Sequence, residues 1–206
     1  MKKALLSLAL LVTSSIAIAQ VTVSPGIKAG INKSNISDME GTSSKTGFHA
    51  GLFVNLDLAS FYELQVETTY SNQGAKVKNY SLDNYQGDVI INENGTSDLN
   101  LDYLSIGIAN KFFIVKDLGV HFIVGPTIDI LLKDDFGDST PIDFSFFGGV
   151  GYEFPFGLAI EARYKQGIID LDDGLTTFGS ENTEYDKNYL NGVLQLGVAY
   201  KFDFRK

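Results

Sequence analysis

The segment NGVLQLGVAYKFDFRK, residues 191–206, alternates between two kinds of side chain from Leu194 onward. One face carries Leu, Val, Tyr and Phe, and the other carries Gln, Gly, Ala, Lys and Asp. This period of two predicts a β-strand, because successive side chains of a strand point to opposite faces. A strand of a soluble protein turns its apolar face to a core, whereas a strand of a membrane barrel turns that face to lipid.

Seven earlier segments alternate in the same way, which gives an even number of predicted strands. They lie at about residues 24–32, 47–57, 62–71, 101–113, 119–131, 142–154 and 157–167. Two residues interrupt the pattern. Asn110 stands in the apolar face of its strand, and Pro126 donates no ladder hydrogen bond, which predicts a bulge or a local break at that position.

The predicted connections alternate between long polar loops and short turns. The long loops cover residues 33–46, 72–100, 133–141 and 168–188, and the short turns cover residues 58–61, 115–118 and 155–157. An even strand count with short turns at one end is the plan of an outer-membrane barrel, and it places both termini on the short-turn side. In the longest loop, Asn94-Gly95 predicts a hairpin that projects above the barrel.

The faces opposite the apolar ones combine glycine with polar and charged residues. They hold Lys28, Gly30, Asn32, His49, Gly51, Asn55, Glu63, Gln65, Glu67, Ser105, Gly107, Lys111, Gly149, Gly151, Glu153, Glu161, Arg163, Lys165, Gln195, Gly197, Lys201 and Asp203. Repeated glycine suits the tight interior of a small barrel better than a solvated surface. A soluble barrel of the lipocalin type is the alternative, but the loop asymmetry and the glycines favour an all-β, eight-stranded antiparallel up-and-down transmembrane barrel.

The first residues, MKKALLSLALLVTSSIAIAQ, predict a secretory signal peptide at residues 1–19, followed by the barrel domain at residues 20–206. The chain contains no Cys, which excludes disulfides, thiolate metal sites and a lipoprotein anchor. Its formal net charge of -9 makes nucleic acid an unfavourable partner. After the leader, no apolar run approaches the length of a spanning helix, so entry into a membrane requires a closed barrel.

At GIKAGINKSNIS, residues 26–37, the chain resembles the PorT-like family of small outer-membrane β-barrels from Bacteroidota, known as porin-family proteins. The likeness continues through GFHAGLFVNLDL, LQVETTYSNQGAK, LDYLSIGIANKFF, VGPTIDILL, GLAIEARYKQGI and LQLGVAYKF. One departure is the end of the chain, where Arg205 and Lys206 follow Phe204, while many such barrels finish on an aromatic residue. The resemblance implies this fold and the cell outer membrane. Some relatives are tied to protein secretion, and no catalytic residue carries over.

An enzymatic site would need a His near a Ser or a carboxylate at the outer rim. The predicted topology puts His49 near the outside and His121 near the periplasm, which excludes a paired His site. His49 with Asp129, Asp143 or Ser145 is the remaining arrangement, and a hydrogen-bonded luminal His49 is the better interpretation. We therefore predict that the protein is not an enzyme and has no catalytic, cofactor-binding or metal site.

Charged residues gather in the predicted lower lumen, and the two signs balance. The acids are Asp57, Glu63, Glu67, Glu153 and Glu161, and the bases are Lys28, Lys111, Arg163, Lys165 and Lys201. They form either an ion path or a plug of salt bridges. Eight strands leave a space just wide enough for side chains to fill it, which favours the plug.

Two acidic stretches, KDDFGD at residues 133–138 and DLDDG at residues 170–174, raise the question of calcium. Gly174 stands where an EF-hand pattern needs its fifth-position ligand, so the match fails and solvated acidic loops are favoured. Fifteen of the 25 acidic residues lie in the four predicted long loops. A partner that binds the outer surface therefore encounters negative charge.

These patterns predict a monomeric, plugged barrel with a structural or surface-interaction role. Its expected partners are outer-membrane lipid, the barrel-assembly machinery and an unidentified extracellular or secretion partner, with no cofactor and no nucleic acid. A narrow diffusion channel and an accessory to protein secretion are the alternatives.

Overall fold

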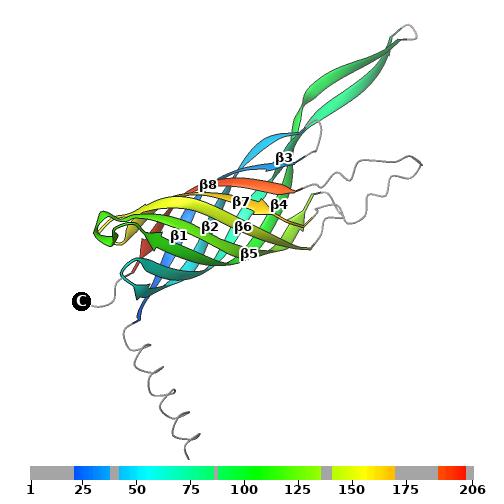
Figure 1. Ribbon diagram of the computed structural model, residues 1–206. Coiled ribbons are helices and arrows are strands. Elements are labelled where there is room, and N and C mark those ends of the chain that lie inside the picture. The colour runs from blue at the N-terminus through cyan, green and yellow to red at the C-terminus, as the bar shows by residue number, and fades with distance from the viewer. Residues whose placement is uncertain (1–20, 38–41, 86–87, 136–140, 170–189, 203–206) are drawn as a thin grey trace, which may run out of the picture.

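A computed structural model shows a closed barrel of eight antiparallel strands (Figure 1). It describes residues 21–37, 42–85, 88–135, 141–169 and 190–202. Each strand pairs with its neighbour in the chain, and the last strand closes the ring on the first. The strands are β1 (Thr22–Ile36), β2 (Thr42–Ala59), β3 (Tyr62–Tyr85), β4 (Asp88–Phe113), β5 (Val120–Asp134), β6 (Ile142–Glu153), β7 (Leu158–Gly167) and β8 (Asn191–Lys201). The predicted fold class is confirmed.

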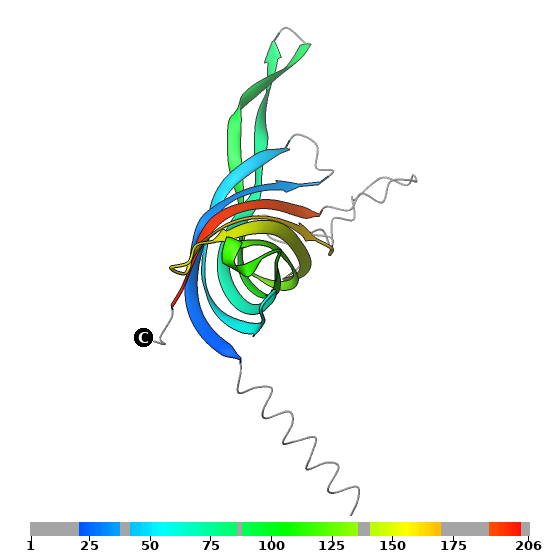
Figure 2. The same cartoon turned by 60° about the vertical axis from the view of Figure 1, so that its left-hand side comes forward.

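The strands on the long-loop side are longer than the sequence pattern predicts. β1 and β2 pair as far as Ser34 and Lys45, and the β3–β4 ladder continues to Tyr85 and Asp88. Most of residues 33–46 and 72–100 is therefore strand, and the long polar connections predicted there are shorter than expected. Because the antiparallel ladder pairs the backbone groups of both strands, a polar hairpin can continue beyond the apolar belt as a ribbon. The upper parts of β3 and β4 project from the barrel end in both views (Figures 1 and 2).

The projecting hairpin is confirmed, but Asn94-Gly95 does not form its turn. Lys78 pairs with Thr96 and Tyr80 pairs with Glu93, so Asn94 and Gly95 lie at a register shift within the ladder. Gly95 has φ 91°, in the left-handed region that glycine tolerates. The same backbone freedom serves a β-bulge as well as a tight turn, which explains the wrong prediction.

The outer face of the barrel is apolar and the inner face is polar. Ile27, Phe146 and Val198 keep 49%, 55% and 50% of their surface exposed, while Lys28 and Arg163 on the inner face keep 7% and 3%. A soluble barrel has the reverse arrangement, so the lipocalin alternative is wrong. The belt of large exposed apolar residues is the lipid-facing surface of a membrane barrel. Within the described part of the chain, no helix has the length and apolarity needed to cross a membrane.

Both predicted irregularities have a structural explanation. The β4–β5 ladder pairs Gly107 with Thr127 and Asn110 with Val124 and skips Pro126 between them without a register shift, so a local break forms there and a bulge does not. Asn110 lies on the outer face, where its Nδ2 donates to the Val124 carbonyl at 3.1 Å and its Oδ1 accepts from the Tyr62 hydroxyl at 2.8 Å. The polar side chain is therefore hydrogen-bonded in an otherwise apolar surface.

Candidate functional site in the barrel lumen

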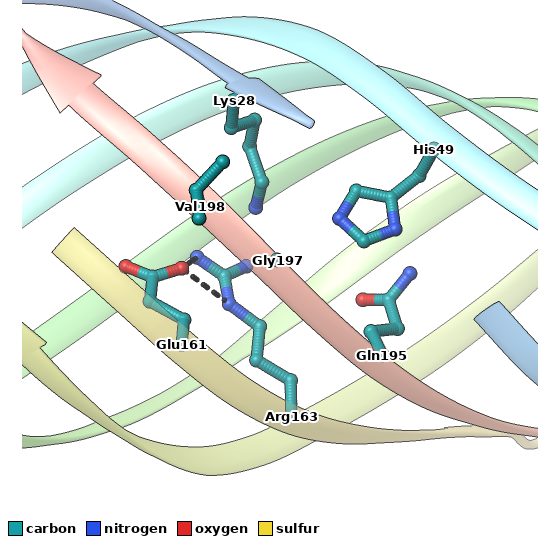
Figure 3. Close-up of a pocket in the computed structure, with 7 residues that line it drawn as sticks. All are labelled: Lys28, His49, Glu161, Arg163, Gln195, Gly197 and Val198. Carbon is teal, nitrogen blue, oxygen red and sulfur yellow. Dashed lines mark hydrogen bonds and ion pairs between the residues drawn. The ribbon is translucent and has the colours of Figure 1, made fainter. Parts of the chain in front are cut away.

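The centre of the lumen holds an ion-pair network around Arg163 of β7. Its Nη1 lies 2.7 Å from Glu67 Oε1 of β3, and its Nη2 lies 2.7 Å from Glu161 Oε2, an interaction visible in Figure 3. β3 and β7 are four strands apart in a ring of eight, so the Arg163–Glu67 pair spans the interior. All three side chains are buried. Planar guanidinium donors suit this bidentate pairing with carboxylates.

Two lysines complete the central network. Lys28 Nζ of β1 lies 3.1 Å from Glu67 Oε2, and Lys111 Nζ of β4 lies 2.9 Å from Glu161 Oε1. The network thus joins side chains from β1, β3, β4 and β7. Charges removed from water must be paired, and each of these groups has a partner of opposite sign.

A second cluster lies at the short-turn end of the barrel. Lys116 Nζ is 3.1 Å from Glu63 Oε1 and 3.9 Å from Asp57 Oδ1, and Lys201 Nζ is 2.6 Å from Glu153 Oε1 and 3.4 Å from Glu63 Oε2. Lys116 belongs to the 3-10 turn η1 (Lys116–Leu118) between β4 and β5, and sequence reasoning missed it because it lies outside the strands. The signal that could have found it is a basic residue three positions after the end of β4.

A third cluster lies toward the long-loop end, around Asp129 of β5. Lys165 Nζ lies 2.9 Å from Asp129 Oδ2, and the hydroxyl groups of Ser105 and Ser145 also donate to this carboxylate. The assignment of Lys165 to the lower lumen is therefore wrong. β7 rises from Leu158 toward the long loops, so Lys165, near the end of that strand, lies above Arg163.

The two histidines lie in separate parts of the lumen, as predicted. His49 Nδ1 is 2.7 Å from Asn32 Oδ1, and Asn32 Nδ2 donates to Ser71 Oγ at 2.9 Å. The amide oxygen of Asn32 is thus the acceptor and His49 Nδ1–H the donor. The described hydrogen bonds of His49 do not include Asp129, Asp143 or Ser145.

Glycines make room for the imidazole of His49. A Cβ on Gly197 would lie 2.9 Å from His49 Nε2, and a Cβ on Gly30 would lie 2.6 Å from His49 Cε1. His121 is fully buried near the short-turn end, where its Nδ1 lies 3.1 Å from the Gly119 carbonyl oxygen. Gly30 and Gly197 therefore act as predicted, as small residues in the tight barrel interior.

The described cavities of the lumen are the size of a water molecule. One, with a volume of about 10 Å³, lies between Lys28, His49, Arg163 and Gln195 (Figure 3). A second, of about 20 Å³, lies above it and reaches Lys165. A cavity of this size has room for about one water molecule. Around Lys28, His49 and Gln195, which line both cavities, the side chains thus leave room for about one water molecule in each.

The acidic stretches considered for calcium lie at the edge of the described chain. Residues 170–174 and 136–138 are outside it. Lys133 Nζ is 3.2 Å from Asp135 Oδ1, and hydrogen bonds from the Asn100 side chain and backbone lower the pKa of Asp135 below its ordinary value. Among the described residues, no group of three or more His, Asp or Glu side chains is arranged to hold a metal ion.

The fold, the apolar belt and the charged interior together define the class of small transmembrane β-barrels. Residues 18–173 match the family described as outer membrane protein beta-barrel domain. The chain belongs to this family, and its location is the cell outer membrane.

Several solved structures resemble the chain at low sequence identity. The attachment invasion locus protein Ail of Yersinia pestis in a nanodisc is 14% identical, with 88% of this chain and 100% of that chain covered and a TM-score of 0.47. Neisserial surface protein A is 18% identical, with coverages of 88% and 99% and a TM-score of 0.43. A designed transmembrane barrel is 12% identical, with coverages of 87% and 95% and a TM-score of 0.43. No curated protein matches the chain.

Proposed function

We propose that the protein is a non-catalytic, plugged outer-membrane barrel that carries a surface-interaction ribbon. The observation that supports the plug most directly is the Arg163–Glu67 ion pair, which spans the interior at 2.7 Å with both side chains buried. The projecting part of β3 and β4 supports the second half of the proposal. The barrel holds this ribbon at the cell surface.

A diffusion channel is the competing function, and the energetics of the lumen disfavour it. A permeating ion would have to separate buried pairs such as Arg163–Glu161 and Lys28–Glu67. Removing one partner of a buried pair typically costs about 3–5 kcal/mol, so an open state of this network would be rarely populated. The small volumes of the cavities around Lys28 and His49, about 10 and 20 Å³, also support a closed lumen.

Solute uptake by porin-deficient cells tests the plug in a native membrane. Expression of the wild-type protein should leave the uptake of a small hydrophilic solute equal to that of cells with an empty vector. A matched variant with Lys28, Glu67, Glu161 and Arg163 changed to Ser should raise uptake, because the central side chains are removed. Uptake that rises with the wild-type protein would contradict the plug in favour of the channel.

We further propose a PorT-like affiliation within Bacteroidota, with a cleaved signal peptide at residues 1–19, which lie outside the described part of the chain. The stretches from GIKAGINKSNIS to LQLGVAYKF support this affiliation. The proposal includes a monomer that is inserted by the barrel-assembly machinery and an accessory role in secretion as the second function. Comparison of the secreted proteins of a deletion strain and its complemented parent tests that role, and identical profiles would reject it.

A further inference from the structure

The β3–β4 ribbon has an open strand edge along β4. β4 pairs with β3 from Asp88 to Phe112, but its pairing with β5 begins only at Leu101, opposite Asp134. The residues of β4 before Leu101 therefore have a strand neighbour on one side only within the described structure. Such an edge presents backbone donors and acceptors that another strand can use.

Contacts at Asn100 identify which backbone groups point out of this edge. The Asn100 N–H donates to Asp135 Oδ2 at 3.1 Å, and the Asn100 carbonyl accepts from the Asp135 N–H at 3.1 Å. The Leu99 carbonyl points the other way, since a Cβ on Gly74 of β3 would lie 2.1 Å from its oxygen. Alternate residues of a strand direct their backbone groups to the same side. Thr96 and Asp98 therefore present N–H and C=O on the same edge as Asn100.

This part of the ribbon is accessible. Thr96, Ser97 and Asp98 are exposed, as is Gly95 at the register shift. Beyond that shift, β4 continues as a paired strand to Asp88. The edge is thus long enough for a short extended segment, with Thr96 and Asp98 as its first two pairing positions.

Charge and symmetry limit what can occupy the edge. The ribbon from residue 75 to residue 99 contains four acids, Asp83, Asp88, Glu93 and Asp98, and two bases, Lys76 and Lys78, and Lys76 Nζ lies 3.8 Å from Asp98 Oδ1. The acids therefore outnumber the bases by two. A basic segment is therefore complementary, and a second acidic ribbon is repelled. Two copies in one membrane are related by a rotation axis along the membrane normal. This rotation keeps the strand direction, so their β4 edges could pair only in parallel. Antiparallel pairing of two copies would require opposing membranes.

We propose that the β4 edge at Thr96 and Asp98 binds an extended, basic peptide segment of another protein by antiparallel strand addition. This inference rests on the proposed surface-interaction role, for which it names the binding edge and the chemistry of the partner. The backbone groups at 96 and 98 supply the hydrogen bonds, and the acidic ribbon supplies the charge preference. Strand addition of this kind derives affinity from the main chain and specificity from the side chains.

The test uses the full-length protein in nanodiscs and a fluorescent, end-blocked eight-residue peptide of alternating Thr and Lys at physiological salt. The control peptide has the same sequence and charge but an N-methyl group on every amide, so it cannot donate ladder hydrogen bonds. The wild-type protein should bind the unmodified peptide and bind the methylated peptide at least about tenfold more weakly. The amide protons of Thr96 and Asp98 should exchange more slowly when the unmodified peptide is bound.

Paired variants separate backbone from side-chain effects. Thr96→Pro with Asp98→Pro removes both outward N–H groups and should weaken binding about tenfold. Proline is tolerated at these positions because it can occupy an edge strand whose N–H groups face solvent. The control, Thr96→Ser with Asp98→Glu, keeps both N–H groups and the negative charge, so it removes none of the proposed binding groups and should bind within about threefold of wild type. Heat-modifiable gel mobility verifies that both variants fold.

Three outcomes would overturn the proposal: no peptide binding, equal binding of both peptides, or no effect of the proline substitutions. Self-association of the wild-type protein that the proline variant abolishes would also overturn it and identify a second copy as the occupant. If the wild-type protein does not conduct ions and any of these results is found, only the proposed binding edge is rejected. A conducting lumen with proline-sensitive peptide binding rejects the plug instead.

Discussion

Gly148 and Gly149 are adjacent in β6 and have opposite surroundings. A Cβ on Gly149 would lie 2.2 Å from the Ala162 carbonyl oxygen and 2.8 Å from Arg163 Cα, whereas a Cβ on Gly148 would meet no atom within 4 Å. Gly149 faces the lumen, and the backbone of β7 approaches it closely. Gly148 faces outward, where the lipid of the outer membrane lies.

This difference predicts different effects for the same substitution at two neighbouring positions. Gly149→Ala requires a backbone shift and should lower the free energy of unfolding by about 1–3 kcal/mol. Gly148→Ala should change it by less than about 0.5 kcal/mol, because space is available. Urea titration of both variants in lipid vesicles, followed by heat-modifiable gel mobility, measures the difference. Equal effects would show that the faces of β6 are assigned wrongly.

The central ion pairs predict a strong effect of removing one charge. Arg163→Met leaves Glu67 and Glu161 with one less basic partner in the interior and should lower the free energy of unfolding by about 3–5 kcal/mol. Adding Glu161→Gln should recover part of the loss. As a control, Lys76→Met breaks the exposed Lys76–Asp98 pair and should cost at most about 1 kcal/mol. The same urea titration applies, and similar losses for Arg163→Met and Lys76→Met would contradict the buried network.

The hydrogen bond between Tyr62 and Asn110 predicts a smaller effect on the outer face. Tyr62→Phe removes the donor to Asn110 Oδ1 and should lower the free energy of unfolding by about 0.5–1.5 kcal/mol. Tyr152→Phe is the matched control, because Tyr152 has no hydroxyl hydrogen bond among the described residues. Equilibrium unfolding in vesicles compares the two variants. An equal response would mean that the Tyr62 hydroxyl contributes nothing through Asn110.

The topology predicts that the two ends of the barrel react differently in living cells. The chain has no Cys, so a single introduced thiol reports on one position. Thr96→Cys lies on the projecting ribbon and Asp117→Cys lies in a short turn, and both positions are exposed. A membrane-impermeant maleimide should label Thr96→Cys on intact cells, and Asp117→Cys only after lysis. The reverse order would invert the orientation.

Much of the fold was predictable because lipid and a tight lumen impose opposite demands on alternate residues. The period of two therefore identified the strands and their faces, including the buried Lys28 and the exposed Val198. The positions of the charged residues along the barrel axis were harder to predict from the sequence. They depend on the stagger between strands, which placed Lys165 beside Asp129 instead of in the lower lumen.

Local sequence also left two features undetermined. Asn110 looked like an interruption because its partner, Tyr62, becomes its neighbour only through the register of β3 and β4. Gly95 has a positive φ, as the Asn-Gly pair suggested, but a positive φ does not distinguish a turn from a bulge. In both cases the deciding contact is between strands.

Single-channel recording in planar bilayers tests the plugged lumen most directly. Purified wild-type protein should give no discrete openings above those of the bilayer alone, because Arg163 pairs with Glu67 and Glu161 across the centre of the barrel. The variant with Lys28, Glu67, Glu161 and Arg163 changed to Ser should form stable channels. Its openings are the positive control that inserted protein can be detected. Stable, discrete openings from the wild-type protein would contradict the plug.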